Sequence, residues 1–128
     1  MTVQDKEANK QLALDFYRSV VVKADFSRLG QLIRPDYIQH STVADDGPEG
    51  LKIFAAGLAA EFPNAEVHFK QVLADGDRVM LHCHLIRFPG DPGIAAMDIF
   101  RIEDGLLAEH WDCFMDVPTS MMSARGLF

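Results

Sequence analysis

The spacing of apolar residues divides the chain into a helical first half and a second half of strands. From Gln4 to Lys23 the apolar positions recur every three or four residues, which is the pattern of an amphipathic helix. Thr2 or Asp5 would cap the start of this helix, because a side-chain oxygen there accepts from its first free N–H groups. The chain is therefore expected to open with one long helix.

Two further helices are predicted in the first half. The first is short and ends near Arg34, because the proline that follows disfavours a helical conformation in the residue before it. The second starts at Pro48, whose missing N–H costs nothing at the first helical position, and it ends before Pro63. The apolar stripes of these two helices are formed by Phe26, Leu29 and Ile33, and by Leu51, Phe54, Ala55, Leu58 and Phe62.

After Pro63 the apolar period changes to two residues, which indicates β-strands. Asp75-Gly76 and Asp104-Gly105 are typical of tight hairpin turns, because both residue types tolerate positive φ. Helices followed by antiparallel strands predict an α+β fold, in which three N-terminal helices pack on a curved antiparallel sheet around a small-molecule pocket. The four expected strands are Val67–Leu73, Arg78–Arg87, Ile94–Glu103 and Leu106–Met115.

Composition places all these elements in one domain that spans residues 1–128. With 48% hydrophobic and 24% charged residues, the chain can build a core without disulfides or structural metal. A net charge of −7 and the lack of any Lys/Arg cluster disfavour nucleic acid and membranes as partners. The polar N-terminus lacks a signal-peptide pattern, so we expect a cytoplasmic protein in which Cys83 and Cys113 are reduced and buried.

The strand at Arg78–Arg87 is apolar on both of its faces, whereas a sheet with one solvated face should alternate cleanly. Because helices can cover only one face, a second copy of the chain is expected to cover the other, giving a homodimer through the sheet. One face carries Val79, Leu81, Cys83 and Leu85, and the other carries Met80 and Ile86.

Titratable side chains interrupt these apolar strands and are the candidates for chemistry. Burying an unpaired charge is costly, so such groups are usually paired, functional or exposed. Each also has a structural explanation: the histidines can bond to backbone or face a polar dimer interface, and the aspartate can anchor a loop or Arg101. The candidates are His40, His82, His84, Asp98, Glu109, His110 and Asp112.

Two registers of the second hairpin group these candidates differently. A regular two-residue turn pairs Asp98 with Trp111 and turns both to one face, away from His110 and Asp112. A single bulge in either strand reverses this and groups Asp98 with His110 and Asp112. The sequence leaves both registers open, and Asp98 is the favoured carboxylate in either of them.

Several short motifs occur in the order that is found in one known family. They are Phe16-Tyr17, Tyr37-Ile38-Gln39-His40, Gly47-Pro48-Glu49-Gly50, Met97-Asp98-Ile99-Phe100-Arg101-Ile102, Asp104-Gly105 and Glu109-His110-Trp111-Asp112. Together they resemble the SnoaL-like polyketide cyclases, from the first helix to Val117. The resemblance implies a nuclear-transport-factor-two-like cone, usually dimeric, and an aldol cyclisation by an aspartate general acid/base without metal or other cofactor. Relatives of that family include isomerases, dehydratases, epoxide hydrolases and binding modules.

The leading hypothesis is a cofactor-free enzyme that acts on a carbon acid beside a carbonyl group of a small molecule. Asp98 would be the base or proton shuttle, while His84, His82 or His40 would bond to the enolate oxygen or protonate the aldol oxygen. The residues expected to line the pocket are Tyr37, Phe54, His82, Phe100, Glu109, His110, Trp111 and Asp112.

Two alternatives remain open on the sequence alone. A non-catalytic ligand-binding or dimerisation module would show a pocket filled by side chains of the tail, such as Met121 and Phe128. A metal-assisted hydrolase would use His82 and His84 as zinc ligands, together with a third histidine or carboxylate and an open position. A single His-x-His pair is a weak signal for such a site.

Overall fold

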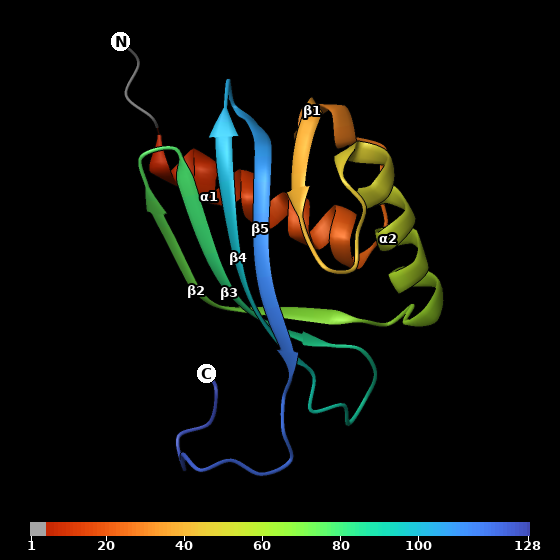
Figure 1. Ribbon diagram of the computed structural model, residues 1–128, viewed down its shortest axis with the longest axis vertical. Helices are drawn as coiled ribbons and strands as arrows, with labels where there is room; N and C mark the ends of the chain where they lie inside the picture. The colour runs from red at the N-terminus through yellow and green to blue at the C-terminus, as the bar shows by residue number, and fades with distance from the viewer. Residues whose placement is uncertain (1–4) are drawn as a thin grey trace.

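The protein has an α+β fold, described by a computed structural model for residues 5–128, in which one five-stranded sheet curves around two helices (Figure 1). The strand order is β1-β5-β4-β3-β2. No helix in this part of the chain is long and apolar enough to cross a membrane. The elements are α1 (Lys6–Phe16), a π-helical segment (Tyr17–Val22), a 3₁₀ turn (Leu29–Gln31), β1 (Ile33–His40), α2 (Gly47–Glu61), β2 (Glu66–Asp75), β3 (Arg78–Ile86), β4 (Ile94–Glu103) and β5 (Leu106–Asp116).

The first helix forms as its apolar spacing predicts. The Asp5 carboxylate accepts from the N–H groups of Glu7 and Ala8 at 3.0 and 3.2 Å, so Asp5 is its N-cap. The predicted cap Thr2 and predicted start Gln4 lie outside the described residues. Beyond Phe16 the helix continues as the π-helical segment, and such segments frequently occur at functional sites.

The prediction of three helices is wrong, because two α-helices form between residues 5 and 128. The segment around Leu29 makes only a 3₁₀ turn, and the chain is extended again from Ile33. Pro35 excludes a longer helix here, and it is tolerated within β1 because β1 is an edge strand. The other helix, α2, is capped by Asp46, so Pro48 is its second residue rather than its first.

All four predicted strands are present, and a fifth strand, β1, completes the sheet. β1 runs parallel to β5, whereas every other neighbouring pair is antiparallel. The expected purely antiparallel sheet is therefore a mixed one. The parallel pairing joins segments about 70 residues apart, which local sequence patterns do not specify.

A β-bulge sets the register of the last hairpin. Ile102 pairs with Leu107, but the preceding residue Arg101 pairs with Glu109, so Ala108 is an extra residue in β5. From this point the pairing is shifted by one residue. As a result, Asp98 and Asp112 become cross-strand partners on one face of the sheet, which is the second of the two registers considered above.

The two faces of the sheet have different surroundings. The inner face is covered by α1 and α2, and in Figure 1 α1 passes behind β4 and β5 while α2 lies beside β1. The outer face is free of helices and exposes apolar side chains, together with the Cys113 thiol, which was expected to be buried. The fully buried side chains of the core are those of Phe16, Val20, Val79, Leu81, Cys83, Phe100 and Leu107.

Candidate active site

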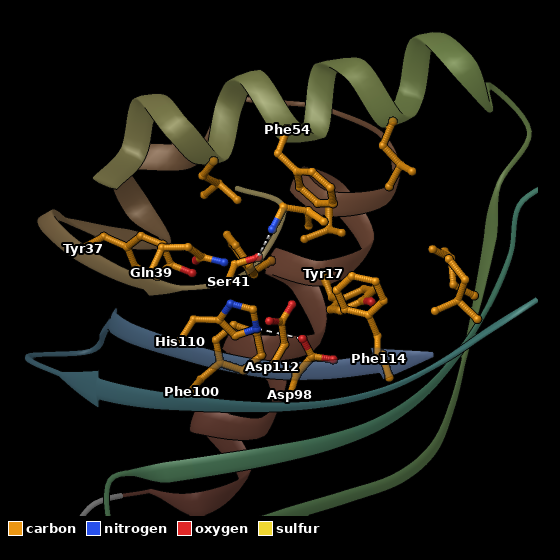
Figure 2. Close-up of a pocket in the computed structure, with 18 residues that line it drawn as sticks. Tyr17, Tyr37, Gln39, Ser41, Phe54, Asp98, Phe100, His110, Asp112 and Phe114 are labelled. Carbon is orange, nitrogen blue, oxygen red and sulfur yellow. Dashed lines mark hydrogen bonds and ion pairs between the residues drawn. The ribbon is translucent and has the colours of Figure 1, made fainter. Parts of the chain in front are cut away.

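A cavity of about 160 Å³ lies between the inner face of the sheet, the π-helical segment and α2. Its walls are mainly apolar, and Phe54, Phe100 and Phe114 lie around it in Figure 2. A volume of this size is comparable with the ~150 Å³ space that holds one benzene ring in a dry protein core. The cavity therefore suits a small, flat, mostly apolar molecule or one end of a larger one.

One buried hydrogen-bonded pair lies on the sheet side of this cavity. Nε2 of His110 lies 2.7 Å from Oδ1 of Asp98, and the two side chains are 9% and 4% exposed. A carboxylate only accepts hydrogen bonds, so Nε2 carries the hydrogen when Asp98 is ionised. The other ring nitrogen, Nδ1, then points away from Asp98 with a free lone pair. The His110 ring also stacks on Phe100, with centroids 4.5 Å apart.

Asp112 adds a second carboxyl group beside this pair. The bulge in β5 turns it to the inner face, where it is half-buried, whereas Asp98 is almost fully enclosed. Burial raises the pKa of Asp112, the Asp98 charge raises it further, and His110 opposes this rise. Asp112 is therefore the carboxyl of the cluster that combines access to the cavity with a raised pKa.

Within residues 5–128, these three side chains are also the ones that could surround a cation. One ligand atom from each of Asp98, His110 and Asp112 lies within 4.8 Å of the others. The 2.7 Å bond to Asp98 already occupies Nε2 of His110. The arrangement is that of a hydrogen-bonded acid/base cluster, with His110 held by Asp98.

A second wall of the cavity comes from β1, the strand next to β5, and from the residue after it. Tyr37, Gln39 and Ser41 are two residues apart, so their side chains share the inner face and line the cavity together (Figure 2). Gln39 is the direct cross-strand partner of His110 in the parallel β1–β5 pair. This pairing holds an amide and a phenol hydroxyl close to the acid/base cluster.

Three buried polar atoms that belong to cavity-lining residues have no hydrogen-bond partner within residues 5–128. They are the Tyr37 hydroxyl, Oε1 of Gln39 and Oδ2 of Asp98. Buried polar groups in proteins are nearly always bonded, and unpaired ones often mark a ligand or catalytic site. Their concentration around one cavity indicates a place where a polar ligand atom is received.

Of the residues predicted to line the pocket, five do so: Tyr37, Phe54, Phe100, His110 and Asp112. The other three, His82, Glu109 and Trp111, lie on the outer face, because their positions alternate with those of the inner residues. Asp98 lines the cavity as predicted. Sequence reasoning did not assign Tyr17 and Gln39 to the pocket, although both belong to motifs that carry the family resemblance.

The prediction that His40 assists Asp98 is wrong in its placement. His40 lies on the outer face, where it stacks on Trp111 with ring centroids 5.1 Å apart and bonds Glu109 at 2.7 Å. The Arg78 guanidinium also contacts this assembly, 5.1 Å from the centroid of the Trp111 ring. Because the His110 side chain lies on the inner face, that of the next residue, Trp111, lies on the outer face, and so does that of His40, the cross-strand partner of Trp111.

His82 and His84 are likewise on the outer face and separated from Asp98 by the sheet. The Phe128 ring stacks on both, with centroid distances of 5.3 Å to His82 and 4.3 Å to His84. His84 also bonds the carbonyl oxygen of Pro92 at 2.7 Å. The two histidines therefore hold the C-terminal tail against the sheet, and neither belongs to the cluster that could surround a metal.

The curved sheet with helices and a cavity on its inner face defines the protein as an α+β fold, consistent with the nuclear-transport-factor-two-like cone that the resemblance implies. Several solved structures have a similar fold. TsrD from Streptomyces laurentii has a TM-score of 0.70 and 22% identity, covering 87% of this chain and 90% of that one. IdmH from Streptomyces antibioticus, provisionally described as a polyketide cyclase, has a TM-score of 0.68 and 23% identity, covering 83% and 91%. A Kribbella flavida protein provisionally described as a ketosteroid isomerase has a TM-score of 0.71 and 17% identity, covering 93% and 86%.

The family follows from the sequence. The chain belongs to the SnoaL-like polyketide cyclase family, whose model matches residues 11–120. No curated protein sequence matches the chain. The match extends from α1 to beyond the end of β5, so it includes every residue of the acid/base cluster.

Proposed function

We propose that this protein is a cofactor-free acid/base enzyme that forms an enolate from a small carbonyl compound, for aldol cyclisation or isomerisation. The observation that carries the proposal is the half-buried Asp112 carboxyl beside the buried Asp98–His110 pair in an otherwise apolar cavity. Membership of the SnoaL-like family supports the same kind of chemistry. General acid/base groups work best when their pKa lies near the operating pH, and burial moves Asp112 in that direction.

In this proposal Asp112, rather than Asp98, removes the proton. Oδ1 of Asp98 is bonded to His110 and Oδ2 is shielded, whereas Asp112 is the more accessible of the two carboxyl groups. The carboxylate takes the proton from the carbon beside the carbonyl, and the C–H electrons move into the carbonyl to form an enolate. The enolate carbon then attacks a second carbonyl, which closes a ring, or takes the proton back at another carbon, which isomerises the substrate.

Asp98 is a positioning residue in this scheme. Its bond to Nε2 orients the His110 ring and stabilises any positive charge that develops on it. His110 can then accept at Nδ1 the proton that Asp112 removed from carbon and pass it on to the alkoxide oxygen, which returns Asp112 and His110 to their starting states. The cluster thus comprises one base (Asp112), one proton relay (His110) and one orienting carboxylate (Asp98), all on β4 and β5.

The test is proton exchange at carbon, which needs no knowledge of the natural substrate. Deuterium incorporation into 2-tetralone is followed by NMR with wild type, Asp112→Asn and Asp116→Asn, after subtraction of the rate without protein. Asp116 is the matched control, because it lies on the same strand with an exposed side chain. We expect Asp112→Asn to lower the exchange rate about 100-fold or more, in the range of general acid/base catalysis. Equal rates in all three proteins would refute the role of Asp112.

The alternative of a non-catalytic module required a pocket filled by the tail, and the structure does not show this arrangement. Phe128 stacks on the outer-face histidines, and neither Met121 nor Phe128 lines the cavity. The metal-assisted alternative used His82 and His84, which point to the face opposite the cavity. The acid/base enzyme is therefore the function that the geometry of the cavity supports best.

We further propose that the enzyme is a cytoplasmic homodimer that associates through the outer face. Met80, Ile99 and Trp111 are consecutive cross-strand partners and form an apolar row across this face. Met80 and Ile99 are both 37% exposed, and Met97 and Met115 beside them are more exposed still. Large contiguous apolar surfaces of this kind are typical of protein interfaces. A second copy would bury them without covering the cavity on the inner face.

A further inference from the structure

The cavity carries a hydroxyl group that the acid/base cluster does not use. The Tyr37 side chain is only 2% exposed, yet its hydroxyl has no hydrogen-bond partner in the part of the chain that the structure describes. Such a group destabilises the folded protein, because it gives up its bonds to water and gains none. A phenylalanine would fill the same space without this cost, so the hydroxyl calls for an explanation.

The position of Tyr37 is set by β1. Gln39 is the cross-strand partner of His110, and Tyr37 lies two residues earlier on the same face. The Tyr37 ring packs 6.4 Å from Phe16, which holds it against the core. Tyr37 and Gln39 therefore form a second polar region of the cavity, on a different strand from Asp98 and Asp112, as Figure 2 shows.

The charges of the cavity decide what this region can receive. An enolate carries its developing negative charge on oxygen, and this oxygen needs hydrogen-bond donors. On the β4–β5 side the Asp98 carboxylate repels this oxygen, and Asp112 is occupied with the proton that it has taken from carbon. Burial and the nearby carboxylates raise the pKa of Tyr37 well above its ordinary value, so its hydroxyl keeps its proton and remains a donor. The amide of Gln39 offers a second donor when its NH₂ group faces the cavity.

We propose that the Tyr37 hydroxyl, assisted by the Gln39 amide, binds the substrate carbonyl oxygen and stabilises it as it becomes an enolate. This inference rests on the proposed function, since it names the residues that bind the carbonyl oxygen of the substrate in the same reaction. It separates the site into two walls: the β4–β5 wall moves the proton, and the β1 wall holds the oxygen. The substrate carbonyl then points toward β1, with its acidic carbon toward Asp112.

The experiment measures equilibrium binding of an enolate mimic, so it is independent of turnover. 2-Naphthol presents one phenolic oxygen on a flat apolar frame, and 2-methylnaphthalene has the same shape without that oxygen. Affinities of both are measured by fluorescence titration for wild type, Tyr37→Phe, Gln39→Met and Tyr17→Phe. Tyr17 is the matched control, because it is a buried tyrosine that lines the same cavity from the π-helical segment.

We expect Tyr37→Phe to weaken 2-naphthol binding about 10-fold or more, as for loss of a hydrogen bond to a charged or polarised oxygen. Gln39→Met should weaken it less, and Tyr17→Phe by less than about twofold. Binding of 2-methylnaphthalene should stay within about twofold of wild type in every variant. Tyr37→Phe should also raise the melting temperature of the free protein, because it removes a buried unpaired hydroxyl, whereas loss of a structural bond would lower it.

Several results would overturn the inference. These are no binding of 2-naphthol to wild type, an equal loss for both probes, a larger effect of Tyr17→Phe than of Tyr37→Phe, or a lower melting temperature in Tyr37→Phe. The proposed function has a separate test: it fails if Asp112→Asn exchanges deuterium as fast as wild type. Asp112→Asn that retains 2-naphthol binding but has lost exchange would show that the two walls act independently.

Discussion

The energetic importance of the Asp98–His110 pair can be tested by replacing its members singly and together. In His110→Phe the new ring keeps the stacking on Phe100, so packing is largely retained while the bond to Asp98 is lost. Oδ2 of Asp98 already lacks a partner within the described chain, and the substitution leaves Oδ1 without one as well. The enclosed carboxylate then has no hydrogen bond on either oxygen.

The magnitude follows from the burial of the pair. Leaving a buried charged group without its partner costs about 3–5 kcal/mol, so we expect His110→Phe to lower the free energy of unfolding by about 3 kcal/mol at pH 7. Replacing both partners by apolar residues of similar size is often neutral. The double variant Asp98→Leu/His110→Phe should therefore lie within about 1 kcal/mol of wild type.

A matched control is available on the outer face. His40 makes an equally short bond of 2.7 Å to Glu109, but its side chain is 47% exposed. His40→Phe should cost about 1 kcal/mol or less, because exposed pairs contribute little. Urea unfolding followed by circular dichroism gives all these values, provided that the denaturant slopes are equal. A double variant as unstable as the sum of its single changes would refute the reasoning, as would a His110→Phe loss no larger than that of His40→Phe.

Three further outcomes are expected. Burial raises the pKa of Asp112 in the folded protein, so the contribution of Asp112 to stability is present below its unfolded pKa of about 4 and is lost as the pH rises. Thermal melts should therefore show Asp112→Asn to be more stable than wild type at pH 7 and equally stable at pH 3. The Asp91 carboxylate accepts from Arg87 at 2.7 and 2.9 Å, and this pairing lowers the pKa of Asp91. Asp91→Asn should therefore lower the free energy of unfolding in urea by roughly 2 kcal/mol at pH 7, and its difference from wild type should shrink as the pH falls below about 4. Ile99→Glu should yield a folded monomer by light scattering, and a wild-type monomer would contradict the homodimer.

Local features of the fold follow from the sequence, because short-range forces produce them. The cap at Asp5, the three-to-four spacing of α1 and the alternation in β2 to β5 each depend on neighbours within a few residues. The two Asp-Gly turns behave in the same way, and both carry a glycine with positive φ at residues 76 and 105. The apolar residues on both faces of β3 were likewise visible in the sequence, and Met80 of the outer face is 37% exposed in the single chain, while its covering by a second copy stays a prediction.

Other features were decided only by the tertiary structure. Pairing β1 with β5 depends on contacts across about 70 residues, and it turned a predicted helix end into a strand that brings Tyr37 and Gln39 to the cavity. The bulge at Ala108 is a single extra residue, invisible in the apolar pattern, yet it moves every later side chain of β5 to the other face.

The candidate site illustrates the physical reason for this division. Sequence alone identified Asp98, His110 and Asp112 as unusual residues in apolar strands, because charged groups in such positions require a partner or a role. It could not determine which histidine meets Asp98, since strand residues alternate between faces and a shift of one residue exchanges them. The strand register that packs the core therefore also determines which histidine lines the cavity: it places His110 beside Asp98 and leaves His40, His82 and His84 on the outer face.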